Sequence, residues 1–192
     1  FGLLSQQKIQ IMLDRGMIRP AMPLSTGQLQ PASLDLRLGP KAYRVRASFL
    51  PGRGRTVAEQ LERLSSDVIS LEGEGAVLER GCVYVVPLLE SLELPQSIAG
   101  IANPKSSTGR LDIFTRLITD RGEAFDRVEA GYRGPLYAEI SPQTFPILVR
   151  EGSRLSQIRF RQGASLATDA LIRKLHTSEG LISSGEVNID NG

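Results

Sequence analysis

The chain has 192 residues, 41% of them hydrophobic, and a mean hydropathy of −0.10, which suits one domain with its own core and excludes intrinsic disorder. Its 23 lysines and arginines and 21 aspartates and glutamates are interspersed and give a net charge of +2, so a general nucleic-acid-binding surface is not expected. No apolar run approaches the ~18 residues that a membrane span needs.

Two helices are predicted in the first third of the chain. The first covers residues 5–16, since Ser5 can cap its start and Gly16 can end it. The second begins at Thr56, which forms a capping box with Glu59. Both segments carry apolar residues at helical spacing, namely Ile9, Met12 and Leu13 in the first and Val57, Leu61 and Leu64 in the second.

Most of the remaining chain has the pattern of short strands. In the segment Pro31–Gly39, leucines alternate with Asp35 and Arg37, which predicts a half-buried strand. Further apolar runs lie at 68–71, 76–78, 83–86, 98–102, 136–140, 145–149 and 155–160. Glycine, proline and serine separate these runs at short intervals, which favours an all-β jelly roll or closed barrel with a few short helices.

The composition changes after this β-rich part, which we take as a domain of residues 1–163. Residues 166–175 are expected to form a helix, and residues 178–192 have the Gly, Ser, Asn and acid content of a linker. We therefore treat 164–192 as a C-terminal helix and linker. Because the chain begins at Phe1 rather than methionine and ends in this linker, we expect it to be one part of a longer protein.

The run KSSTGR, residues 105–110, gathers the donors that a triphosphate requires. Lys105, Ser106, Ser107 and Arg110 supply hydroxyls and cations within a few residues. Pro104 and Gly109 favour a tight loop that opens a short helix, whose first N–H groups attract phosphate. A capped surface turn is the alternative interpretation.

Glu139 is the acid best placed for proton transfer. If Leu136, Ala138 and Ile140 face one side of a strand, Tyr137 and Glu139 share the other side. In a partly apolar cleft, such a carboxyl group could accept and donate protons during catalysis. The alternative is a solvated carboxylate at a sheet edge.

Two further segments, DRVEAGYRG at 126–134 and GSRLSQIRF at 152–160, contain polar residues between apolar ones. On their own they fit a hairpin turn and an amphipathic strand. Together with Pro31–Gly39, KSSTGR and Glu139, however, they occur in an order that resembles the deoxycytidine triphosphate deaminases of the trimeric dUTPase superfamily. The resemblance covers roughly Leu3 to Phe160 and implies a dUTPase-like distorted jelly-roll barrel.

The resemblance implies roles for the residues of these motifs. Glu139 would move protons between the attacking water, the cytosine ring nitrogen and the leaving ammonia, while Ser106 and Arg110 would orient that water and stabilise developing charge. The substrate-binding residues would be Lys105, Ser107 and Gln157 at the phosphates and Arg127, Glu129 and Tyr132 at the deoxyribose. The sequence departs from the family pattern at Lys105, Gly109 and Glu129, where arginine, alanine and aspartate are usual.

Metal requirements follow from the residue counts. A zinc-dependent nucleobase deaminase needs a His or Cys together with a Cys-x-x-Cys pair, and this chain has one histidine, His176, and one cysteine, Cys82. Deamination would therefore proceed without zinc, and we expect His176 on an exposed helix without a catalytic role. The resemblance implies magnesium bound with the triphosphate, with Asp35 bonding the barrel backbone or touching the ion's outer shell. The unpaired cysteine fits a reducing cytoplasm.

The predicted function is the conversion of dCTP to dUTP and ammonia by a homotrimer whose sites lie between subunits. One alternative is a dUTP pyrophosphatase or a bifunctional enzyme, in which an acid at Glu129 activates water against the α-phosphate. A second alternative is a non-catalytic domain that binds nucleotide or braces an active partner.

Overall fold

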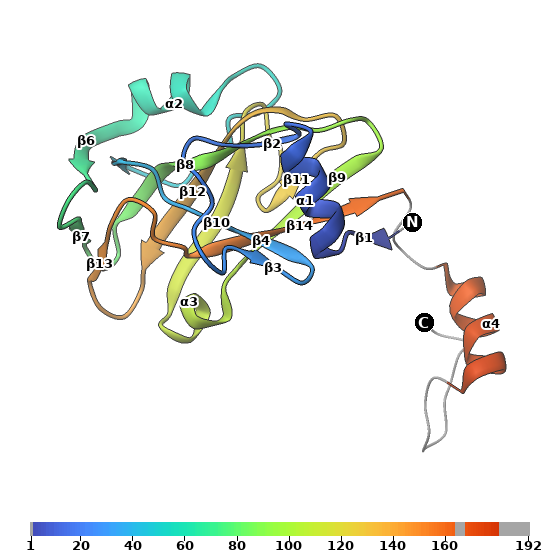
Figure 1. Ribbon diagram of the computed structural model, residues 1–192. Coiled ribbons are helices and arrows are strands. Elements are labelled where there is room, and N and C mark those ends of the chain that lie inside the picture. The colour runs from blue at the N-terminus through green and yellow to red at the C-terminus, as the bar shows by residue number, and fades with distance from the viewer. Residues whose placement is uncertain (1, 164–167, 181–192) are drawn as a thin grey trace.

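The computed structural model describes residues 2–163 and 168–180, and two antiparallel sheets form its centre (Figure 1). The first sheet has the order β11 (Arg127–Val128), β9 (Ile98–Pro104), β14 (Ser156–Gln162), β4 (Ser33–Leu36) and β3 (Leu29–Gln30), with β1 (Gly2–Leu3) beside β14. The second has the order β10 (Ile113–Thr119), β12 (Arg133–Pro142), β8 (Val83–Glu93), β5 (Lys41–Val45) and β6 (Ser65–Ser70), with β2 (Ile18–Pro20) beside β8. Strands β7 (Ala76–Leu78) and β13 (Ile147–Val149) form a separate pair.

The core lies between the two sheets. Leucines 34 and 36 of β4 and Phe160 of β14 pack in one buried cluster with Leu117 of β10 and Leu136 of β12. The β-rich part of the prediction is therefore confirmed, and each of the apolar runs overlaps a strand. Strands β5 and β10 were not among those runs.

The helices α1 (Gln6–Asp14), α2 (Val57–Leu64), α3 (Ser106–Arg110) and α4 (Asp169–Glu179) occur close to where the sequence predicts helices. The capping box of α2 is confirmed, because Thr56 Oγ1 accepts the Glu59 N–H at 3.2 Å and the Glu59 carboxylate accepts the Thr56 N–H at 2.7 Å. Helix α4 has no buried residue and carries His176, as expected. Residues 164–167 and 181–192, which include most of the predicted linker, lie outside the described residues. No described helix is long and apolar enough to cross a membrane.

Strand β4 differs from its prediction, because both of its faces are buried. The leucines enter the core, but Asp35 and, just beyond the strand, Arg37 are also covered, with exposed fractions of 1% and 4%. Arg37 is covered because its guanidinium donates to the carbonyls of Met22 and Pro23 and to the carboxylate of Glu90. The alternating pattern predicts a strand with one buried face, whereas here hydrogen bonds and ion pairs also make burial of the polar residues possible.

Strand β12 is at the centre of the second sheet, between β10 and β8. Its inward residues Ala138 and Ile140 join the core, and Tyr137 belongs to a third cluster on the opposite face. That outer cluster includes Val57 and Leu61 of α2, and Phe49, Leu50 and Phe125 pack against it. Glu139 lies on this covered outer face, which confirms that it shares a side with Tyr137.

Candidate active site

Glu139 is a buried carboxylate that is held by a partly buried arginine of the neighbouring strand. It lies opposite Arg116 of β10 in the strand register and has an exposed fraction of 1%. Its Oε1 atom accepts hydrogen bonds from Arg116 Nε at 3.1 Å and from Arg116 Nη2 at 2.6 Å. The other oxygen, Oε2, is buried and has no hydrogen-bond partner among the described residues. The alternative of a solvated edge carboxylate is therefore wrong.

Arg116 is held by contacts on several sides. Its Cζ atom lies 3.6 Å from the centre of the Phe125 ring and 4.6 Å from that of Phe114, distances at which a cation is attracted to an aromatic face. Its Nη2 atom also donates to Ser48 Oγ at 2.8 Å. These contacts fix the guanidinium beside Glu139.

A second carboxyl group, Asp126, neighbours this pair. It accepts the Leu117 N–H at 2.8 Å and adopts a left-handed backbone conformation with φ of 60°. Burial raises the pKa of Asp126, against the lowering effects of the Leu117 N–H and the Arg116 cation, and the negative charge of Glu139 raises it further. Two acids and one guanidinium thus share one partly apolar region.

The cover over this region is built from two loops joined to each other. Gly52 N–H donates to the Gly122 carbonyl at 3.1 Å, and Arg121 N–H donates to the Arg55 carbonyl at 3.0 Å. Side chains add to the junction, because the Val57 N–H donates to Asp120 Oδ1 at 2.7 Å and Arg53 pairs with Glu123. We call residues 49–56 and 119–126 the paired loops.

The KSSTGR segment forms α3, as the sequence predicts, but its residues have different environments. Lys105 makes an ion pair with Asp35, and Arg154 lies 3.6 Å from the same carboxylate oxygen. The other Asp35 oxygen, Oδ1, is buried without a hydrogen-bond partner among the described residues. Gln157 lies opposite Asp35 in the sheet and accepts a hydrogen bond from Ser33 Oγ at 3.0 Å. Lys105 and Gln157 are therefore brought together around Asp35.

Within α3, Thr108 is buried, whereas the three predicted site residues lie at the surface. Ser106, Ser107 and Arg110 are exposed, and within residues 2–163 and 168–180 their side chains make no hydrogen bond or ion pair. They leave hydroxyl and guanidinium donors on the surface for a ligand or another copy of the chain.

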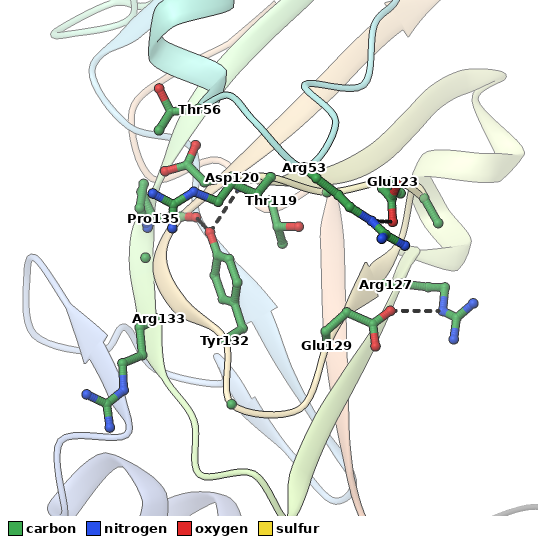
Figure 2. Close-up of a pocket in the computed structure, with 15 residues that line it drawn as sticks. Arg53, Thr56, Thr119, Asp120, Glu123, Arg127, Glu129, Tyr132, Arg133 and Pro135 are labelled. Carbon is green, nitrogen blue, oxygen red and sulfur yellow. Dashed lines mark hydrogen bonds and ion pairs between the residues drawn. The ribbon is translucent and has the colours of Figure 1, made fainter.

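The third group of predicted residues lines a cavity of about 990 Å³, shown in Figure 2. Arg127 and Glu129 are exposed at its wall and pair loosely, with 3.8 Å between Nε and Oε1. Tyr132 stands between them and Asp120, and its hydroxyl donates to the Pro135 carbonyl at 2.5 Å and accepts the Asp120 N–H at 3.1 Å. Burial raises the pKa of Tyr132, so it stays a neutral hydrogen-bonding group.

Two walls of this cavity come from the paired loops. Arg53 and Thr56 belong to one loop, and the stretch from Thr119 to Ala124 belongs to the other. Glu139, α3 and Gln157 do not line the cavity. The nine predicted site residues therefore fall into three groups within one chain: Glu139, the residues around α3, and the cavity residues.

The sequence interpretation did not identify Arg116, Phe125 or Asp120. One signal was available for Arg116, because a cation in the apolar segment IFTRLIT, Ile113–Thr119, requires a partner when the strand is covered. Identifying Glu139 as that partner requires the pairing register of β10 with β12. No signal in the sequence indicated how the 119–126 loop covers the site.

The comparisons with known proteins identify the family of the chain. Residues 1–164 match the model of the 2'-deoxycytidine 5'-triphosphate deaminase (DCD) N-terminal domain. A dCTP deaminase of Actinobacillus succinogenes is 30% identical over 156 residues, 77% of each chain, and a dUMP-forming dCTP deaminase of Parafrankia sp. is 32% identical over 158 residues, 81% of this chain and 74% of that protein.

A crystal structure of 2'-deoxycytidine 5'-triphosphate deaminase from Agrobacterium tumefaciens is 56% identical, with a TM-score of 0.87. The match covers 96% of this chain and 55% of that one, so the present chain spans about half the length of the Agrobacterium protein. This similarity confirms the fold that the motifs implied. The chain belongs to the 2'-deoxycytidine 5'-triphosphate deaminase family.

Proposed function

We propose that this chain catalyses the zinc-independent hydrolytic deamination of dCTP to dUTP and ammonia. The observation that carries the proposal is the carboxylate of Glu139, which is buried, held through one oxygen by Arg116, and left with its second oxygen unpartnered among the described residues. Buried polar atoms are almost always hydrogen-bonded, so an unpartnered oxygen marks a position where a water or substrate atom would bind. Family membership supplies the substrate class.

In the proposed reaction Glu139 moves protons in both directions. Its Oε2 atom accepts a proton from the water that attacks C4 of cytosine and passes it to ring nitrogen N3 as the hydroxyl group adds to that carbon. The proton of the new C4 hydroxyl group then passes through Glu139 to the exocyclic amine, the C4=O bond forms, the C4–N bond breaks, and ammonia leaves. Protonation of N3 makes C4 electrophilic, so the step requires no Lewis acid.

Ser106 and Arg110 would orient the attacking water and stabilise the developing charge. Because these side chains are exposed and unpartnered in the described part of the chain, they suit a homotrimer in which α3 of one copy completes the site of its neighbour. Lys105, Ser107 and Gln157 would bind the phosphates. Arg127, Glu129 and Tyr132 would contact the deoxyribose at the cavity wall.

Magnesium would enter with the triphosphate. The described residues contain no cluster of three or more His, Cys, Asp or Glu side chains able to hold a metal ion. The buried, unpartnered Oδ1 of Asp35 fits a bond to water in the shell of an ion held mainly by phosphate oxygens. When bound, the ion would neutralise phosphate charge. A cytoplasmic location is part of the proposal and is supported by the unpaired Cys82.

A bifunctional enzyme that also releases pyrophosphate is the second candidate. The observation that favours it is the exposed carboxylate of Glu129 at the cavity wall, an acid available to activate water against the α-phosphate. Its 32% identical relative from Parafrankia sp. is a dUMP-forming dCTP deaminase.

The test is an assay of the purified chain with dCTP and with dUTP and magnesium, in which ammonia and pyrophosphate are measured separately. We expect ammonia from dCTP, and Glu139→Gln should remove it. Treatment with a zinc chelator followed by fresh magnesium should leave the rate unchanged. Pyrophosphate from both substrates would support the bifunctional enzyme. Binding of dCTP without either product would support the non-catalytic alternative.

A further inference from the structure

The contacts of Arg116 indicate that it orients the buried Glu139 carboxylate as well as neutralising its charge. Its Nε and Nη2 atoms both bond to Oε1 of Glu139, rather than one to each oxygen as in a bidentate pair. Two bonds to one atom fix the rotation of the carboxylate and leave Oε2 as the oxygen available for the reaction. A partner that only balanced charge would not need this geometry.

The surroundings of Arg116 hold it in this orientation. Phe125, at the end of one paired loop, covers the guanidinium at 3.6 Å, and Ser48, which directly precedes the other loop, accepts from Nη2. The side chain of Arg116 is 25% exposed and that of Glu139 is 2% exposed, so the cation lies between the acid and solvent.

We propose that Arg116 is a positioning residue for deamination, which holds the Glu139 carboxylate in the rotation that leaves Oε2 available for proton transfer. The inference rests on the proposed function, because it assigns Arg116 a task within the same reaction. Arg116 would act through Glu139 without touching the substrate. Since misplacement of a catalytic group by about 1 Å can lower a rate ~10²-fold, the expected effect is large.

The experiment compares Arg116→Gln and Arg116→Lys with the wild-type chain. We expect Arg116→Gln to lower kcat for dCTP by about 10²-fold while KM changes little. Arg116→Lys keeps the charge but lacks the two-donor fork, so it should rescue kcat only in part, to on the order of tenfold below the wild-type value.

The matched control is Arg150→Gln, which removes an exposed arginine whose nearest acid, Glu74, is 3.7 Å away. It should retain the wild-type kcat. Thermal unfolding of each variant identifies losses caused by misfolding, and if Arg116→Gln does not fold, Arg116→Lys decides the question. A wild-type kcat in either Arg116 variant would overturn the inference.

The outcomes also separate this inference from the proposed function. If the wild-type chain is active, Glu139→Gln is inactive and Arg116→Gln retains full activity, only the positioning role is wrong. If the wild-type chain releases no ammonia, or Glu139→Gln remains active, the proposed function itself is wrong.

Discussion

Two arginine–glutamate pairs in this protein have buried carboxylates but are built in different ways. In the Arg37–Glu90 pair, both carboxylate oxygens are used: Oε1 accepts from Arg37 Nε and from Gln28 Nε2, and Oε2 accepts from the Arg37 N–H. In the Arg116–Glu139 pair, Oε1 takes both bonds and Oε2 takes none among the described residues. The glutamate is similarly buried in the two pairs, but both of its oxygens are hydrogen-bonded in the first pair and, within the described part of the chain, only one in the second.

This difference distinguishes an acid that serves the fold from acids that have an oxygen available for a ligand. Glu90 joins strand β8 to the segment before β3 and has both carboxylate oxygens hydrogen-bonded, whereas Glu139 and Asp35 each retain one buried oxygen without a partner among the described residues. An incompletely bonded acid is unfavourable for the folded protein alone, since buried polar atoms lose their bonds to water. These two acids lie in the motifs that carry the family resemblance.

Glu139→Gln should have the largest effect on activity. Loss of a positioned acid–base group lowers rates by ~10²–10⁴-fold, so we expect kcat for dCTP to fall by that range. Stability should change little, because Arg116 keeps solvent contact. Stopped assays of ammonia give kcat, and thermal unfolding gives the stability. A variant that keeps more than a tenth of the wild-type turnover would remove Glu139 from its proposed role.

Glu90→Gln should lower stability and leave activity nearly unchanged, which is the reverse of Glu139→Gln. It leaves the guanidinium of Arg37, 4% exposed, without a charged partner, and such a change lowers stability by about 3–5 kcal/mol. Denaturant unfolding measures the loss, and kcat per folded molecule should stay near the wild-type value. Equal losses of stability in Glu90→Gln and Glu139→Gln would show that the two pairs do not differ in kind.

Arg110→Ala and Lys105→Ala should separate the water-orienting and phosphate-binding parts of α3. Arg110 should act mainly in the transition state, so its loss should lower kcat by about 10²-fold. Loss of Lys105 should chiefly raise KM for dCTP and matter less for dCMP, which has one phosphate. Steady-state kinetics with both nucleotides measures the contrast, and uniform losses in both variants would indicate a collapsed α3 instead.

Asp126→Asn should have the smallest effect of these substitutions, a slight change in thermal stability. Burial raises the pKa of Asp126 above its ordinary value, so the ionised form lowers stability at pH values above the folded-state pKa. This penalty decreases as the pH falls from the folded-state pKa toward the ordinary value of 3.8, and it is absent below that value. An asparagine oxygen can still accept the Leu117 N–H. We expect a slightly higher Tm near neutral pH and no difference in acid, measured by thermal unfolding across pH. A gain that persists at low pH would have another cause.

Local patterns were sufficient to predict several elements. Thr56 and Glu59 predicted the start of α2, and the alternation around Glu139 predicted which side of β12 it occupies. In both cases neighbours within a few residues decide the structure. The all-β fold followed from the same short-range spacing of apolar runs and turns.

The missed features depend on segments far apart in the sequence. Glu139 has its partner 23 positions earlier, and the bond becomes visible only with the register of β10 and β12. Burial of Asp35 and Arg37 depends on Lys105, Arg154 and Glu90, which no local pattern connects with β4. The grouping of site residues also depends on tertiary structure, because α3 and the Tyr132 cavity lie on different parts of the fold.

The paired loops have a consequence for protein engineering. Gly122 and Arg121 bond to Gly52 and Arg55, so residues 49–56 and 119–126 form one unit although about 60 positions separate them. A chimera that takes only the second loop from a relative would leave N–H and carbonyl groups of the first without partners and would remove Phe125 from Arg116. Recombination and loop-grafting libraries for this protein should therefore exchange the two loops together.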